Sequence, residues 1–230
     1  MVVPVVQAAN APELQHQKHE AIASLKRSFP GLSPASVEAL LDVPRQDFIV
    51  KTAMHRAYED KPLPIGNGSY TLRLSEIGFL LSELDIQSTD TVLEVGTGTG
   101  YLTAILAKLA NSVYSLENNE YLRDYAYDYF RSISQKNVHI KGKNGLRNWQ
   151  AFDEEEAEEE ELRYTFDVIL ITAAISEIPE IILRQLNPGA RLAVPMVGEN
   201  STEWVVYHWN DQKLEEKSRF RALVELAKDN

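Results

Sequence analysis

The sequence contains no cysteine, so it can form neither a disulfide nor a thiolate metal site. It also has no apolar run near the ~20 residues that a membrane-spanning helix requires. Its five histidines do not recur at the spacing of a metal-binding motif. The apolar residues 1–6 lack the basic flank of a signal peptide. We therefore expect a cytoplasmic protein that has no metal site and no contact with a membrane.

The chain also has little basic character. Its formal net charge is −11, and residues 153–161 alone supply eight carboxylates. The rest of the chain is close to neutral, which gives no electrostatic basis for binding nucleic acid. The acidic run has two interpretations. It is either a solvated loop that its like charges keep extended, or a docking segment for a basic partner.

A strand, a glycine turn and a helix start follow one another in the middle of the chain. Thr91–Val95 is β-branched and apolar, which is typical of a buried parallel strand. Gly96, Gly98 and Gly100 then alternate with threonines, and apolar residues recur three and four apart over 101–109. Backbone N–H groups at the start of this helix would face a ligand bound over the glycines.

An acidic residue follows the next predicted strand. Glu117 ends the strand 112–116, roughly 20 residues past the glycines, where a carboxylate can bind both hydroxyls of a ribose. A second acid, Glu94, lies inside the preceding strand. The spacing G-x-G-x-G, together with these acids, resembles the cofactor motifs of class I S-adenosylmethionine (SAM)-dependent methyltransferases. An NAD-dependent oxidoreductase is the alternative, although it would favour the spacing G-x-G-x-x-G.

Similarity to one family extends over residues 37–225. The motifs that carry it occur in order, and they are V-P-R-x-x-F at 43–48, A-Y-x-D-x-P-L-P-I-G at 57–66, V-L-E-V-G-T-G-T-G-Y at 92–101, F-D-V-I-x-x-T-A-A at 166–174 and R-F-x-x-L-V at 219–224. The chain therefore resembles the protein-L-isoaspartate O-methyltransferase family. The loop at 62–68, rich in proline and glycine, is either a plain connector or a lid that faces the substrate.

The resemblance implies an α/β fold of the class I SAM-dependent methyltransferase type, with a doubly wound, mostly parallel sheet and an N-terminal helical extension. Residues 1–75 would form the N-terminal helices and the substrate-facing loop. Residues 76–230 would form the Rossmann-like SAM-binding domain with the acidic loop 153–161. The resemblance further implies SAM as cofactor, a protein or peptide as substrate, and methylation of isoaspartyl carboxylates as a protein repair reaction. A diverged relative that methylates another substrate, or that only binds and regulates, is the alternative.

Periodicity and turn residues predict the remaining elements. Helices are expected to start near Gln15, at the Ser33 cap and at Tyr121, and another is expected over 178–186, before the turn Asn187-Pro188-Gly189. The further predicted strands are 138–140, 166–172, 191–197, 203–209 and 220–226.

Site residues follow from the resemblance. Those that would hold SAM are Glu94, Gly96, Thr97, Gly98, Glu117, Asn118, Asn144 and Gly145, and those that would face the substrate are Pro64, Ile65 and Gly66. Asn144 stands where the family has an aspartate, because the triplet Lys143-Asn144-Gly145 replaces G-D-G. An amide keeps one oxygen acceptor for the adenine amino group.

The serine that the family has at its reacting centre is absent here. Its position falls on Leu72 or Arg73, depending on one inserted residue, and Thr71 is a nearby hydroxyl. Arg73 either pairs with the acceptor carboxylate or lies on the surface at a helix N-terminus. Because an ionised carboxylate needs no general base, loss of the serine need not abolish methyl transfer.

Overall fold

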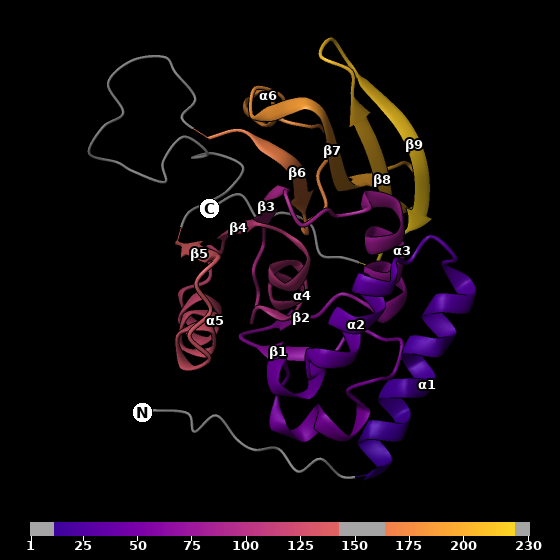
Figure 1. Cartoon of the computed structure of the whole chain (residues 1–230), viewed down its shortest axis with the longest axis vertical. Coiled ribbons are helices and arrows are strands. Elements are labelled where there is room, and N and C mark those ends of the chain that lie inside the picture. The colour runs from indigo at the N-terminus through magenta and orange to yellow at the C-terminus, as the bar shows by residue number, and fades with distance from the viewer. Residues whose placement is uncertain (1–11, 143–163, 224–230) are drawn as a thin grey trace.

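The computed structural model describes residues 12–142 and 164–223, and its centre is one sheet of seven strands (Figure 1). Their order is β5 (Val138–Lys141), β4 (Ser112–Leu116), β3 (Thr91–Val95), β6 (Phe166–Ile171), β7 (Leu186–Val197), β8 (Thr202–Trp209) and β9 (Leu214–Arg221). The first five are parallel, and β8 and β9 are antiparallel. The strand order reverses beside β3, where open α/β sheets bind ligands. The predicted doubly wound, mostly parallel sheet is confirmed.

Helices cover both faces of this sheet. In the described residues they are α1 (Pro12–Ser28), α2 (Pro34–Asp42), α3 (Leu74–Leu84), α4 (Tyr101–Leu109), α5 (Glu120–Ser132) and the short α6 (Glu180–Leu183). The Ser33 side chain accepts a hydrogen bond from the Ser36 N–H, so the predicted cap of α2 is confirmed. Within the described part of the chain, none of these helices has the length and apolar character to cross a membrane.

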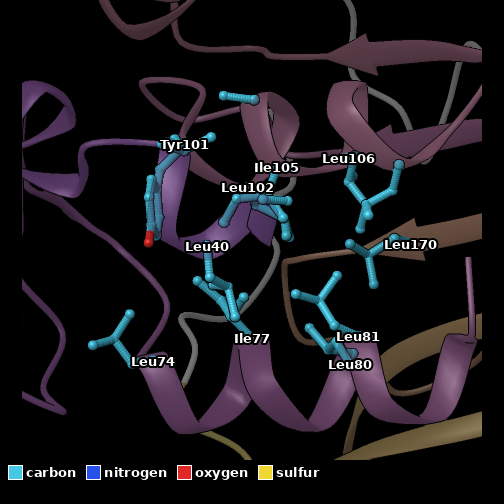
Figure 2. Packing of buried hydrophobic residues seen from close by; sticks show 14 of the residues in the cluster. Leu40, Leu74, Ile77, Leu80, Leu81, Tyr101, Leu102, Ile105, Leu106 and Leu170 are labelled. Atoms are coloured by element: carbon cyan, nitrogen blue, oxygen red, sulfur yellow. The ribbon is translucent and has the colours of Figure 1, made fainter. Parts of the chain in front are cut away.

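Side chains of β6 alternate between two cores, as a strand buried on both faces requires. Val168 and Leu170 belong to the larger core, which also contains side chains of α1 to α5, whereas Ile169 and Ile171 pack with α6 on the other face. Figure 2 shows α3 and α4 side chains facing each other beside Leu170. The predicted boundary at residue 75 falls in the first turn of α3. Side chains of α1 and α2 pack in the same cluster as side chains of the sheet, so the N-terminal helices share one core with the sheet.

Residues 43–73, between α2 and α3, form a compact segment rather than an extended connector, and we call it the cover segment. It contains two short 3₁₀-helices, η1 (Arg45–Phe48) and η2 (Lys51–Arg56), and an antiparallel pair formed by β1 (Pro64–Gly66) and β2 (Ser69–Tyr70). The turn between β1 and β2 has positive φ angles at Gly66, Asn67 and Gly68, which explains its glycine content.

Two sequence predictions are wrong in their bounds. The helix expected over 178–186 is only α6, and Asn187-Pro188-Gly189 lies inside β7, at an irregularity where Gly189 has a φ of +75°. Tertiary pairing decides this, because Leu186 is buried against Phe166 of β6. The last strand, expected over 220–226, is β9, which begins at Leu214. Its sequence is rich in charged residues, as is common in edge strands, so the pattern of apolar residues did not predict where it begins.

Candidate functional site

The glycine turn lies at the carboxyl end of β3, beside the point where the strand order reverses. Its three glycines have positive φ angles, with values of 97° at Gly96, 56° at Gly98 and 98° at Gly100. The Thr172 hydroxyl donates to the Val95 and Gly96 carbonyls, at 2.9 and 3.0 Å. A Cβ on Gly96 would lie only 2.0 Å from that hydroxyl oxygen. The turn therefore requires glycine at this position, both for its backbone angle and for space.

Glu94 is fully buried directly before the turn. Its Oε2 accepts hydrogen bonds from Thr103, at 2.5 Å, and from Ser115, at 2.6 Å, and the Ser115 hydroxyl also contacts that of Thr97. Its Oε1 has no hydrogen-bond partner among the described residues. Burial raises the pKa of Glu94 to about 7. A buried carboxylate oxygen without a donor favours a ligand that supplies one.

The raised pKa predicts a stability change with pH. Between pH 4.5, the ordinary value, and about 7 the unfolded chain loses this proton while the folded chain keeps it. Wild-type stability should therefore fall across this window, relative to Glu94→Gln, by up to about 1.4 kcal/mol per pH unit, and the difference should level off above pH 7. Urea denaturation of both proteins from pH 4.5 to 8 measures it. Parallel curves would show that Glu94 is ionised throughout.

Glu117 joins the glycine turn to the start of α5. Its Oε2 accepts from the Gly98 N–H at 2.7 Å, and its Oε1 accepts from the Asn119 N–H at 2.8 Å. The Asn118 N–H also donates to this carboxylate, while the Asn118 residue is exposed. Burial raises the Glu117 pKa, and these donors oppose the shift. The predicted cofactor acids and glycines are thus brought together at the ends of β3 and β4.

The residues predicted to face the substrate belong to a segment that lies against the same turn. Ile65 is buried, and its Cδ1 would be 3.2 Å from a Cβ placed on Gly98. Gly66 lies against the Tyr121 ring of α5. The Thr99 hydroxyl donates to the Phe48 carbonyl at 2.6 Å, which ties η1 to the glycine turn. The segment 64–66 therefore covers the turn from the side of the N-terminal helices.

All three residues at the family's serine position have partners within the chain. The Thr71 hydroxyl oxygen accepts from the Leu63 N–H at 3.1 Å and from Arg45 at 2.9 Å, and the Leu72 carbonyl accepts from Arg45 at 2.7 Å. The Arg73 guanidinium donates to the Arg221 carbonyl at 2.7 Å. A role of these residues in catalysis stays a prediction.

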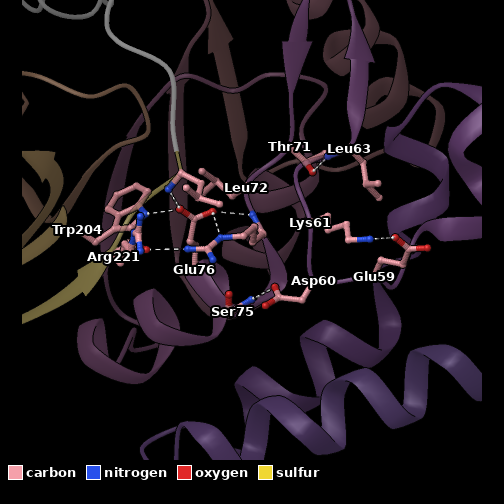
Figure 3. A network of polar contacts seen from close by, with 12 residues as sticks. Glu59, Asp60, Lys61, Leu63, Thr71, Leu72, Ser75, Glu76, Trp204 and Arg221 are labelled. Atoms are coloured by element: carbon pink, nitrogen blue, oxygen red, sulfur yellow. Dashed lines mark hydrogen bonds and ion pairs between the residues drawn. The ribbon is translucent and has the colours of Figure 1, made fainter. Parts of the chain in front are cut away.

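Glu76 completes an Arg73–Glu76 clamp on the segment that follows β9 (Figure 3). This fully buried carboxylate accepts from the Arg73 N–H at 2.8 Å, the Leu223 N–H at 2.6 Å and the Trp204 indole at 3.2 Å. The Arg73 guanidinium lies 3.5 Å from the same carboxylate. The first turn of α3 thereby holds the segment that follows β9.

Arg45 was not recognised from the sequence as a key residue. It is fully buried and donates to the carbonyls of Ala57, Glu59, Lys61 and Leu72 and to the Thr71 hydroxyl. These five contacts gather the whole cover segment around one guanidinium. A single arginine after a proline carries no periodic signal, so only the family motif could have marked it. Lys143, Asn144, Gly145 and the acidic residues 153–161 lie outside the described residues.

Comparison with known proteins decides the relationship. The sequence profile described as Protein-L-isoaspartate(D-aspartate) O-methyltransferase matches residues 16–225. The chain belongs to this family. A protein-L-isoaspartate O-methyltransferase from Petrotoga mobilis is 37% identical over 167 residues, which cover 72% of this chain and 74% of the relative. One from Pelobacter propionicus is 33% identical over 195 residues, covering 84% and 81%.

A solved structure supports the fold of this family member. A Plasmodium falciparum protein assigned to the same family, solved with S-adenosyl-L-homocysteine, aligns over 93% of this chain and 99% of its own. The TM-score is 0.73 at 22% sequence identity. At that identity the likeness shows the fold alone, and it agrees with the class I methyltransferase architecture predicted from the motifs.

Proposed function

We propose that the protein is a SAM-dependent carboxyl methyltransferase that acts on isoaspartyl residues of proteins or peptides. One observation carries the proposal. Within a chain of this family, Glu117 and the glycine turn form one connected site, in which Glu117 accepts from the Gly98 N–H at 2.7 Å. The proposal includes a cytoplasmic location, which the lack of cysteine supports.

The residues present fit SAM. Gly96 and Gly98 have no Cβ atoms, so their backbone suits a close approach of the methionine part, and the Glu117 carboxylate would accept from the ribose hydroxyls. Glu94, two residues before Gly96, has one carboxyl oxygen without a partner among the described residues. Asn118 lies beside Glu117, and Asn144 with Gly145 would complete the adenine side. When bound, SAM supplies a methyl group that its sulfonium already activates.

The role of the protein is then to position the acceptor carboxylate. The acceptor carboxylate is ionised near neutral pH, so no general base is required. One carboxylate oxygen forms a bond to the methyl carbon while the sulfur–methyl bond breaks, and the products are a methyl ester and S-adenosylhomocysteine. Residues 64–66 of the cover segment would hold the acceptor in line with the methyl group and exclude water, and such positioning lowers the barrier to transfer. Thr71 lies in this cover and is held by Arg45.

A second candidate function rests on the Arg73–Glu76 clamp. The Arg73 guanidinium is occupied within the chain, because it contacts the Arg221 carbonyl and the Glu76 carboxylate. The serine that the family has at this position is absent. A family member with a different acceptor, or one that binds SAM without transfer, fits this observation. A basic protein partner for residues 153–161 is a further proposal, which their charge alone supports.

The test is transfer of a labelled methyl group from SAM to an isoaspartyl peptide, with the matching aspartyl peptide as control. Base-labile label on the isoaspartyl peptide alone is the expected result. Label on neither peptide, with SAM binding retained, would favour the second candidate. Binding of NAD without binding of SAM would contradict both.

Replacement of the ribose acid gives a separate prediction. Glu117→Ala should raise the Kd for SAM about 100-fold, because two hydrogen bonds to a charged group are lost. Glu117→Gln, which keeps one acceptor, should lie between this variant and the wild type. Isothermal titration with SAM measures both. Glu120→Ala is the matched control, since its exposed side chain lies three residues after Glu117 in the first turn of α5, and a 100-fold loss there would refute the assignment.

A further inference from the structure

The ring of Tyr121 lies where the cofactor side of the site meets the cover segment. Tyr121 is in the first turn of α5, four residues after Glu117. Its ring lies against Gly66, where a Cβ would be 2.9 Å from the ring carbon Cε1. Gly66 has a φ of +103° and directly follows Ile65, which reaches the glycine turn. The Tyr121 ring therefore packs against the backbone that covers the glycine turn.

More than half of the Tyr121 surface is open to solvent. Tyr121 is 59% exposed, and Tyr70, which pairs with Pro64 across the β1–β2 strands, is 55% exposed. Burial of a tyrosine ring is favourable, so a large ring left open at the rim of a site is available to a ligand. Tyrosine suits this use because it offers a rigid apolar surface and a hydroxyl at low entropic cost.

We propose that the Tyr121 ring contacts the polypeptide that flanks the methyl acceptor and so helps to determine which peptides are methylated. The inference rests on the proposed function. A residue inside a polypeptide reaches the glycine turn only if its neighbours cross the rim of the site. The Tyr121 ring lies on that rim, against Gly66, while Glu117 and the glycines remain on the cofactor side.

Variants of Tyr121 test the contact, and α5 supplies a matched control. Tyr127 is 56% exposed on the same helix, but six residues further on it points to a different side. Tyr121→Ala should raise the KM for an isoaspartyl peptide with residues on both sides about tenfold, while the Kd for SAM stays unchanged. Tyr121→Phe, which keeps the ring, and Tyr127→Ala should stay within about threefold of the wild type.

A second arm varies the peptide. Truncating the residues that flank the isoaspartyl residue should remove the difference between the wild type and Tyr121→Ala, because the contact is then absent from both. Equal KM values with the full peptide, or an equal loss in Tyr121→Phe and Tyr121→Ala, would overturn the inference.

A binding measurement separates this inference from the proposed function. Fluorescence anisotropy of a labelled isoaspartyl peptide, with protein saturated with S-adenosylhomocysteine, reports peptide affinity without turnover. A weaker affinity in Tyr121→Ala than in Tyr127→Ala supports the contact. Failure of the wild type to transfer methyl groups would refute the proposed function, whereas equal affinities of the two variants would refute the role of Tyr121.

Discussion

Gly96→Ala is expected to abolish measurable SAM binding, with an increase in Kd of at least about 100-fold. The new Cβ would lie 2.0 Å from the Thr172 hydroxyl oxygen, and the backbone at +97° is unfavourable for any residue but glycine, at a cost of about 1–3 kcal/mol. Thr172 cannot move away without losing its hydrogen bonds to Val95 and Gly96. The turn must therefore shift, and with it the Gly98 N–H that donates to the Glu117 carboxylate.

Titration with SAM and thermal unfolding measure this effect. Gly189→Ala is the matched control, because Gly189 also has a positive φ, of 75°, but has open space where its Cβ would lie. The control should lose some stability and keep its SAM affinity. Wild-type affinity in Gly96→Ala would show that the turn does not hold the cofactor.

Arg45→Lys is expected to destabilise the protein by about 3 kcal/mol or more. The buried guanidinium satisfies four carbonyls and one hydroxyl from different directions, and a lysine ammonium has three donors at a single point. Several carbonyls would be left buried without donors, and each such group costs about 1–3 kcal/mol. Because these carbonyls belong to the cover segment, methyl transfer should fall together with stability.

Urea denaturation gives the free energy of unfolding of this variant. Arg56→Lys is the control, because Arg56 is partly exposed and its contacts are to Glu59 on the surface. It should change stability by less than about 0.5 kcal/mol. A loss in Arg45→Lys no larger than this would mean that the cover segment holds together without the guanidinium.

Sequence reasoning succeeded where one local pattern determines structure. The apolar spacing in residues 101–109 predicted α4 with its observed bounds, and the distance from the glycines to Glu117 predicted their meeting. It failed where a distant partner decides. Leu186 belongs to a strand because it packs on Phe166, and Arg45 matters because five groups converge on it after folding. The spacing of apolar residues along the sequence does not show which distant residues will be in contact after folding.

The Arg73–Glu76 clamp has a consequence for synthesis of the chain. Glu76 and Leu223 are 147 residues apart, so the buried carboxylate gains this donor only after β9 has been made. Contacts of such long range form late and slow folding. In a nascent chain that ends before β9, Glu76 therefore lacks the Leu223 donor, and the sheet lacks its edge strand. We expect the newly made protein to become active only as β9 docks, so that chains without this strand do not modify other proteins.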